Sequence, residues 1–105
     1  MPNYKGRAYY MAEDPHGVLS ASGTVGLMDG STLTVGLPQT VRAAYQIPVG
    51  SIVLLDGRVR ATLVESGAVR GHKILATAAV LEQLGVQEGA AVAFSVHPRE
   101  SAAVK

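Results

Sequence analysis

Basic side chains in the second half of the chain could bind phosphate groups. Arg58 and Arg60 are two residues apart, which places them on one face of a β-strand. Arg70, His72 and Lys73 follow on the next loop and strand. Cationic side chains that neutralise phosphates give an affinity for nucleic acid that weakens with salt. Strand pairing that gathers these residues would create a phosphate-binding patch; the alternative is an ordinary solvated face of the protein.

Two other groups of residues could support binding of nucleic acid. Arg42 lies in a segment with helical spacing, where it could contact DNA or brace the surface by pairing with a carboxylate. Tyr4, Tyr9 and Tyr10 could stack on bases, as aromatic side chains of single-strand binders do. The alternative for these tyrosines is to cover a seam or one end of the fold.

The residue types required for catalysis or metal binding do not occur at useful spacings. His16, His72 and His97 are far apart in the sequence and share no ligand spacing. No serine lies in a G-x-S-x-G context, and neither glycine-rich phosphate-loop pattern is present. The sequence therefore predicts no catalytic residues, no metal site and no cofactor.

The composition indicates one small domain with an aliphatic core. The chain has 105 residues, of which 48% are hydrophobic but only 5% are aromatic. It has no cysteine, and its net charge of +1 is a weak basic excess for a nucleic-acid binder. No apolar run is long enough to span a bilayer, and the N-terminus has no apolar signal region. We expect a cytoplasmic protein without a membrane partner.

An internal repeat organises the chain. Gly50 and Gly89 lie 39 residues apart, and the residues around them correspond at the same offset. Such a period is a signal about the whole fold. The pairs that are identical or alike in kind are Val35/Ile74, Val41/Val80, Tyr45/Leu84, Ile47/Val86 and Val53/Val92.

Each half reads as a strand, a short helix, a turn and a strand. Pro38 suits the first turn of one helix, and Thr77 is a plausible N-cap for the other. Asp29-Gly30 and Asp56-Gly57 are typical of hairpin turns. We expect strands over residues 4–10, 18–28 (broken by Gly23 and Gly26), 31–37, 51–55, 58–64, 72–75 and 91–96, and helices over 38–46 and 77–84.

The two halves predict a closed barrel, because neither could bury both of its faces alone. Halves of about 18–56 and 57–97, related by a pseudo-twofold axis, would remove the exposed strand edges. The predicted fold is mainly β, with six to seven strands and two short α-helices. We expect one domain over residues 1–100 and a disordered tail over 101–105.

One motif of the first half consists of Leu37-Pro38, Val41-Arg42, Tyr45, Ile47, Gly50 and Val53. With this motif the first half resembles the AbrB/SpoVT swapped-hairpin family, whose members are usually dimeric DNA-binding regulators or antitoxins. The second half resembles the same unit more loosely, with Thr77 and Leu81 in place of the proline and arginine. Two such units in one chain look like the cradle-loop group, which includes double-psi barrels.

A second set of residues spans more of the chain: Leu37-Pro38, Asp56-Gly57, Gly67, Gly89 and Pro98-Arg99. With these the chain is similar to an uncharacterised bacterial barrel family associated with YdeI-like proteins, for which no activity is implied.

The sequence thus predicts a non-enzymatic binding module with DNA as its first candidate ligand. Arg58, Arg60, Arg70 and Lys73 would contact phosphates, assisted by Arg42. The alternative is a structural or protein-interaction barrel that docks a partner protein or forms a homodimer or larger homo-oligomer. The wider barrel group also includes enzymes, but no constellation of residues in this chain supports that class.

Overall fold

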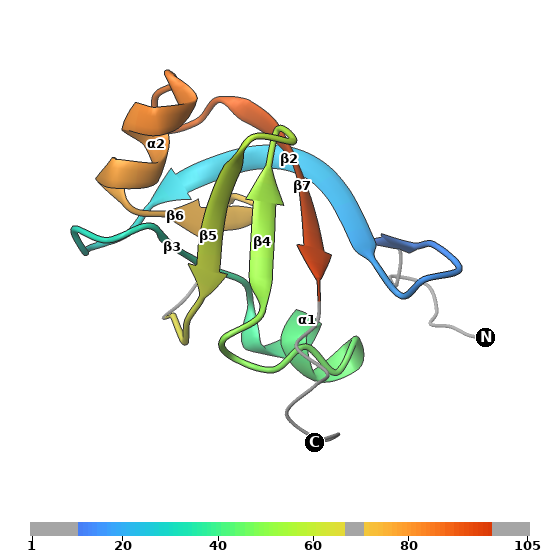
Figure 1. The fold of residues 1–105 in the computed structure, drawn as a ribbon. Coiled ribbons are helices and arrows are strands. Elements are labelled where there is room, and N and C mark those ends of the chain that lie inside the picture. The colour runs from blue at the N-terminus through green and yellow to red at the C-terminus, as the bar shows by residue number, and fades with distance from the viewer. Residues whose placement is uncertain (1–10, 67–70, 98–105) are drawn as a thin grey trace.

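The computed structural model describes residues 11–66 and 71–97, and Figure 1 shows their arrangement. The expected strand over residues 4–10 and the expected tail over 101–105 lie outside this part of the chain. The described elements are β1 (Ala12–Glu13), β2 (Leu19–Leu27), β3 (Thr34–Gly36), α1 (Gln39–Ala44), β4 (Ile52–Leu55), β5 (Val59–Leu63), β6 (Ile74–Ala76), α2 (Ala78–Leu84) and β7 (Ala91–His97).

Six of these strands close into a barrel. Their order is β2, β6, β3, β5, β4 and β7, and β2 also pairs with β7, so the sheet returns to its start. The two-residue strand β1 is added outside the ring on β2. The barrel is mixed, since β2 is parallel to β6 and β3 is parallel to β5. The predicted mainly β barrel with two short helices is confirmed.

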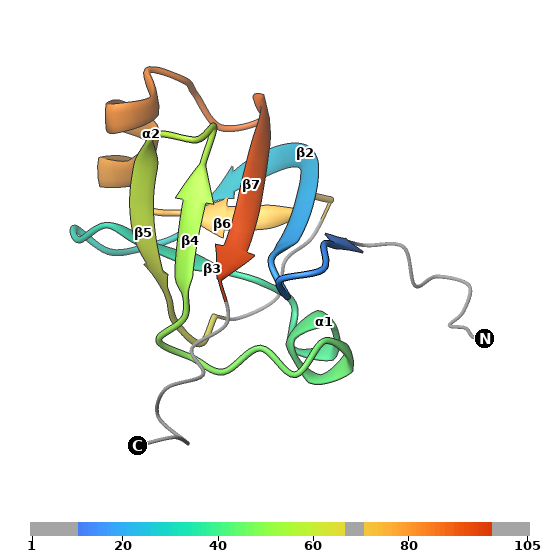
Figure 2. The same ribbon diagram turned by 45° about the vertical axis from the view of Figure 1, so that its right-hand side comes forward.

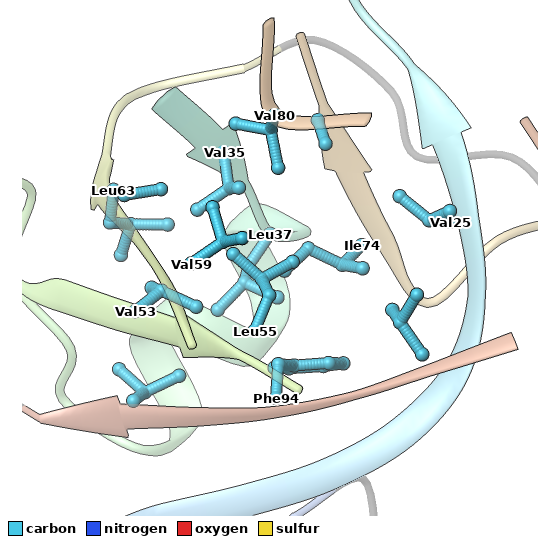
Figure 3. Packing of buried hydrophobic residues seen from close by; sticks show 14 of the residues in the cluster. Val25, Val35, Leu37, Val53, Leu55, Val59, Leu63, Ile74, Val80 and Phe94 are labelled. Atoms are coloured by element: carbon cyan, nitrogen blue, oxygen red, sulfur yellow. The ribbon is translucent and has the colours of Figure 1, made fainter. Parts of the chain in front are cut away.

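The barrel interior is filled by aliphatic side chains. Strand β5 alternates buried and exposed residues along its whole length, as expected for one wall of a barrel. Leu55 and Phe94 enter the core from neighbouring strands, with Val59 beside them (Figure 3). Leu55 is fully buried and Phe94 is 3% exposed. The low aromatic content of the sequence therefore corresponds to a core of Val, Leu and Ile around one phenylalanine.

Gly50 and Gly89 occupy equivalent places in the two halves. Both adopt the left-handed backbone region, at φ values of 100° and 94°. The N–H of Gly50 donates to the carbonyl of Leu63 at 2.8 Å, and the N–H of Gly89 donates to the carbonyl of Val25 at 2.7 Å. A residue in β5 and its counterpart in β2 thus receive the same bond from the two halves. The repeat in the sequence therefore corresponds to two halves of the barrel that share this backbone hydrogen bond.

Two local expectations are corrected by the structure. Residues 28–33 do not form a hairpin turn, because β2 and β3 are not neighbours: β6 lies between them. Strand β2 is continuous from Leu19 to Leu27 and is not broken at its glycines. A Cβ on Gly26 would lie 2.6 Å from a ring carbon of His72, so glycine at this position lets the His72 ring pack closely against β2.

The expected hairpin at Asp56-Gly57 is confirmed, whereas the expected side-chain cap at Thr77 is wrong. Asp56 and Gly57 both have positive φ values, 52° and 70°, and join the antiparallel pair β4–β5 as a hairpin. Gly85 ends α2 in the left-handed region, where glycine is favoured. Thr77 precedes α2, but its hydroxyl does not cap the helix. It is buried and donates instead to the carbonyl of Thr32, which ties the loop before β3 to the start of α2.

Candidate functional site

The predicted phosphate contacts lie on different sides of the barrel. Arg60 belongs to β5, whereas the side-chain stem of Lys73 lies against Gly23 of β2. Strands β2 and β5 are three steps apart in either direction around the six-stranded ring, so they form opposite walls. Arg42 lies on α1, below the barrel in Figure 1. Arg70 lies outside the described residues. The structure therefore does not bring Arg42, Arg60 and Lys73 together on one face.

Arg58 binds the C-terminal end of α2. Its guanidinium donates to the carbonyl of Leu84 at 2.9 Å and to that of Gln83 at 3.5 Å. The last carbonyls of a helix have no partner within the helix and carry a partial negative charge, which a cation stabilises. No pattern in the sequence connects Arg58 with Leu84, which is 26 residues away. Its observed contacts are structural.

Lys73 and His72 pack on glycines of β2 where β6 begins. A Cβ on Gly23 would lie 2.7 Å from a methylene carbon of Lys73, so only glycine leaves room for this stem. Nδ1 of His72 lies 3.3 Å from the hydroxyl of Thr24, which also donates to the carbonyl of Gly71 at 3.4 Å. Both contacts are satisfied together when the imidazole Nδ1 carries the proton and donates to the Thr24 oxygen.

The outer surface of β5, β4 and β7 is not covered by any described element. These three strands lie side by side, with α2 above and α1 below them (Figures 1 and 2). The register aligns Arg60 with Leu54 and Leu54 with Ser95. We call this surface the uncovered face; it consists of the outward side chains Arg60, Thr62, Ile52, Leu54, Ala91, Ala93, Ser95 and His97.

The uncovered face has little charge. Arg60 is its one charged side chain among the outward residues, and it stands at one edge. Leu54 and Ile52 form a partly exposed aliphatic centre, flanked by serine and alanine side chains. Ser95 and His97 contact one another, with 3.3 Å between the hydroxyl and Nε2. Residues 52–55 are all apolar in sequence, so only the structure shows that Ile52 and Leu54 are the outward ones.

A hollow beside α1 contains Arg42. It has a volume of about 390 Å³ and is shallow. Nε of Arg42 is buried and has no hydrogen-bond acceptor among the described residues. A buried donor without an acceptor costs about 1–3 kcal/mol, so the side chain is not simply a satisfied surface brace. The residues lining the hollow are Gln39, Arg42, Ala43, Gln46, Ile47 and Pro48.

The carboxylate of Asp14 accepts hydrogen bonds from the backbone of its own loop. The backbone N–H groups of Val18 and His16 donate to the carboxylate of Asp14, each at 2.9 Å, and hold the pKa of Asp14 below its ordinary value. This carboxylate orders the loop before β2. The described part of the chain contains no cluster of three or more His, Asp or Glu side chains suited to a metal ion. It also has no helix with the length and hydropathy of a membrane span.

Comparison with known proteins identifies the fold. No family model and no curated protein matches the chain. Among solved structures, the crystal structure of the computationally designed protein msDPBB_sym2 is similar, with a TM-score of 0.58. The match has 18% sequence identity and covers 71% of this chain and 95% of that one. The chain is a barrel of the double-psi type. At this identity the likeness establishes the architecture of the double-psi barrel and nothing about a ligand.

Proposed function

We propose that the protein is a non-enzymatic binding module that pairs with a second copy of itself through the uncovered face. The observation that carries this proposal is the aligned row Arg60, Leu54 and Ser95, which crosses the three neighbouring strands β5, β4 and β7. The centre of the row is complementary to its own reverse, because Leu54 and Ser95 are a large and a small side chain on neighbouring strands. A twofold axis lying in the interface, parallel to the strands and between β4 and β7, reverses the order of the row.

The reversed row places large side chains over small ones. Leu54 of each copy lies over Ser95 of the other. No like charges meet in this arrangement, because Arg60 stands at opposite edges in the two copies. The aliphatic centre loses its contact with water. An interface with a depleted charge at its core is typical of homodimers.

The energy available from the row is modest but measurable. Leu54 is only partly exposed, so burying the rest of its side chain stabilises by about 0.5 kcal/mol, since full burial of a leucine is worth about 1.5–3 kcal/mol. Two copies of Leu54 then contribute about 1 kcal/mol, which is about fivefold in the dissociation constant. A lysine at this position would remove that term and would place a cation beside Arg60 in the same row.

Sedimentation of two matched variants tests the proposal. We expect the wild type to show a concentration-dependent monomer–dimer equilibrium and Leu54→Lys to remain monomeric. Leu27→Lys is the control, because Leu27 is a leucine at the end of β2, 50% exposed, outside the uncovered face. The control should dimerise like the wild type. A monomeric wild type, or equal dimerisation of Leu54→Lys, would refute the proposal.

DNA binding of the AbrB-like kind remains a second candidate, and the unpaired Nε of Arg42 favours it. The separation of Arg60 from Lys73 and the engagement of Arg58 on α2 give it less geometric support. Its test is electrophoretic retardation of duplex DNA with wild type and an Arg42→Ala/Arg60→Ala variant. Salt-sensitive retardation that disappears in the variant would support this candidate; unchanged retardation would reject these two residues as phosphate contacts.

A further inference from the structure

The two halves of the barrel provide an internal comparison for the hollow beside α1. Helix α1 and helix α2 make the same backbone bonds. The N–H of Arg42 donates to the carbonyl of Pro38 at 3.0 Å, and the N–H of Leu81 donates to that of Thr77 at 3.1 Å. The following turns also correspond, since Ile47 N–H bonds back to the Arg42 carbonyl as Val86 bonds to that of Leu81. Differences between the side chains at these positions are therefore not required by the backbone.

The first difference is an arginine where the other half buries a leucine. Leu81 is 7% exposed and belongs to the hydrophobic core. Arg42 occupies the equivalent place, is partly buried and leaves Nε without an acceptor among the described residues. Leu81 demonstrates that an apolar side chain can fill this position of the barrel. The arginine is thus a costly choice for packing alone.

The second difference is a glutamine where the other half has a glycine. Gln46 has a φ of 56°, and its counterpart Gly85 has a φ of 75°. This left-handed region suits glycine and is unfavourable for most other residues. Gln46 lines the hollow beside Arg42, and so does Gln39, whose counterpart in α2 is Ala78. The first half therefore adds three long polar side chains at one place where the second half has alanine, leucine and glycine.

We propose that the hollow beside α1 is a binding site for a small oxyanion, either the carboxylate of an organic acid or a phosphate. The guanidinium of Arg42 supplies the positive charge and the planar donor groups that both oxyanions accept. The amide groups of Gln39 and Gln46 supply neutral donors on either side. Ile47 and Pro48 provide an apolar wall for the carbon part of an organic acid. Among the described residues that line the hollow the charge is positive, which favours an anion.

This site is independent of the uncovered face, because it uses α1 and the turn after it and none of the residues in the row across β5, β4 and β7. An oxyanion would give the charge of Arg42 a partner, and the movement of the guanidinium toward it would free Nε from its enclosed position. The cost of the unpaired Nε of Arg42 is then recovered on binding. The second half, with Leu81 and Gly85, has no such site and serves as scaffold.

The side-chain Nε–H signal of Arg42 in a nitrogen–proton NMR spectrum tests the proposal directly. The probes are sodium acetate and inorganic phosphate, titrated separately at constant ionic strength against sodium chloride. We expect a saturable shift of the Arg42 signal with at least one probe and a much smaller change at Arg58, whose guanidinium is already engaged on α2. Saturation by acetate alone identifies a carboxylate site; saturation by phosphate identifies a phosphate site. Shifts that are linear, or equal at Arg42 and Arg58, would overturn the proposal.

Variants that copy the second half into the first separate a binding role from a structural one. Arg42→Leu and Gln46→Gly should each raise the melting temperature of the ligand-free protein, since they remove the unpaired donor and the backbone strain. Arg42→Leu should also weaken oxyanion binding about tenfold or more, because a charge-assisted hydrogen bond is lost. Gln87→Ala, an exposed residue of the corresponding turn in the second half, is the matched control and should bind as wild type does. Destabilisation by both variants would show that these residues serve the fold, and would refute the assignment.

Discussion

Replacing Arg58 with alanine should destabilise the barrel at the C-terminal end of α2. The guanidinium bonds the Leu84 carbonyl at 2.9 Å and the Gln83 carbonyl at 3.5 Å, so the longer contact adds little. A cation at a helix C-terminus contributes about 0.3–1 kcal/mol at exposed positions. Together with one charge-assisted hydrogen bond partly open to solvent, we estimate a loss of about 1 kcal/mol in the free energy of unfolding. That loss lowers the melting temperature by about 4–8 °C for a domain of this size.

Thermal unfolding followed by circular dichroism measures this shift. The control is Arg60→Ala, which removes an exposed arginine two residues further along the chain, on β5. Both variants are compared with the wild type at a protein concentration low enough to keep all of them monomeric, so that self-association does not contribute. Arg60→Ala should change the free energy of unfolding by less than about 0.5 kcal/mol. Arg58→Lys should fall between alanine and wild type, since it keeps the charge but replaces the forked guanidinium with a single ammonium nitrogen. Equal melting temperatures for Arg58→Ala and Arg60→Ala would refute a capping role for Arg58.

Two further predictions concern other parts of the fold. A Cβ on Gly36 would lie 2.4 Å from the side chain of Ser66, so Gly36→Ala should destabilise by about 1–3 kcal/mol in chemical denaturation. Adding Ser66→Gly should recover part of that loss, and no recovery would contradict the steric explanation. The backbone N–H of Val18 lowers the pKa of Asp14, so the bond strengthens the loop above the ordinary pKa of 3.8 and is lost as pH falls through the lower folded value. An NMR titration of the Asp14 carboxyl carbon with a midpoint at or above 3.8 would contradict this.

The barrel could be predicted from the sequence because its repeat is carried by local requirements. Gly50 and Gly89 are needed where the backbone turns through positive φ, and the spacing between them places two similar units in one chain. Alternation of apolar and polar residues in 58–64 predicted the strand β5. Asp56 and Gly57 specified their hairpin through the two positive φ values that this turn requires.

The contacts between distant segments could not be predicted in the same way. The pattern at Asp29-Gly30 resembles a hairpin turn, but strand order decides whether two strands pair, and β6 enters between β2 and β3 from 40 residues further along. Glycines in β2 read as breaks because the side chains that cover them, Lys73 and His72, come from another part of the chain. Arg58 likewise looked like a free cation, since its acceptors on α2 become neighbours only after the barrel closes.

Disulfide pairing of two single-cysteine variants tests the central claim, that the uncovered face joins two copies in one defined arrangement. The chain has no cysteine, so Leu54→Cys and Ser95→Cys each introduce one thiol. After mixing and mild oxidation, we predict that the disulfide between residue 54 of one copy and residue 95 of the other forms in excess over either homodisulfide. The reason is that the twofold axis places these two positions opposite each other twice. A statistical mixture of the three disulfides, or no covalent dimer, would contradict the account.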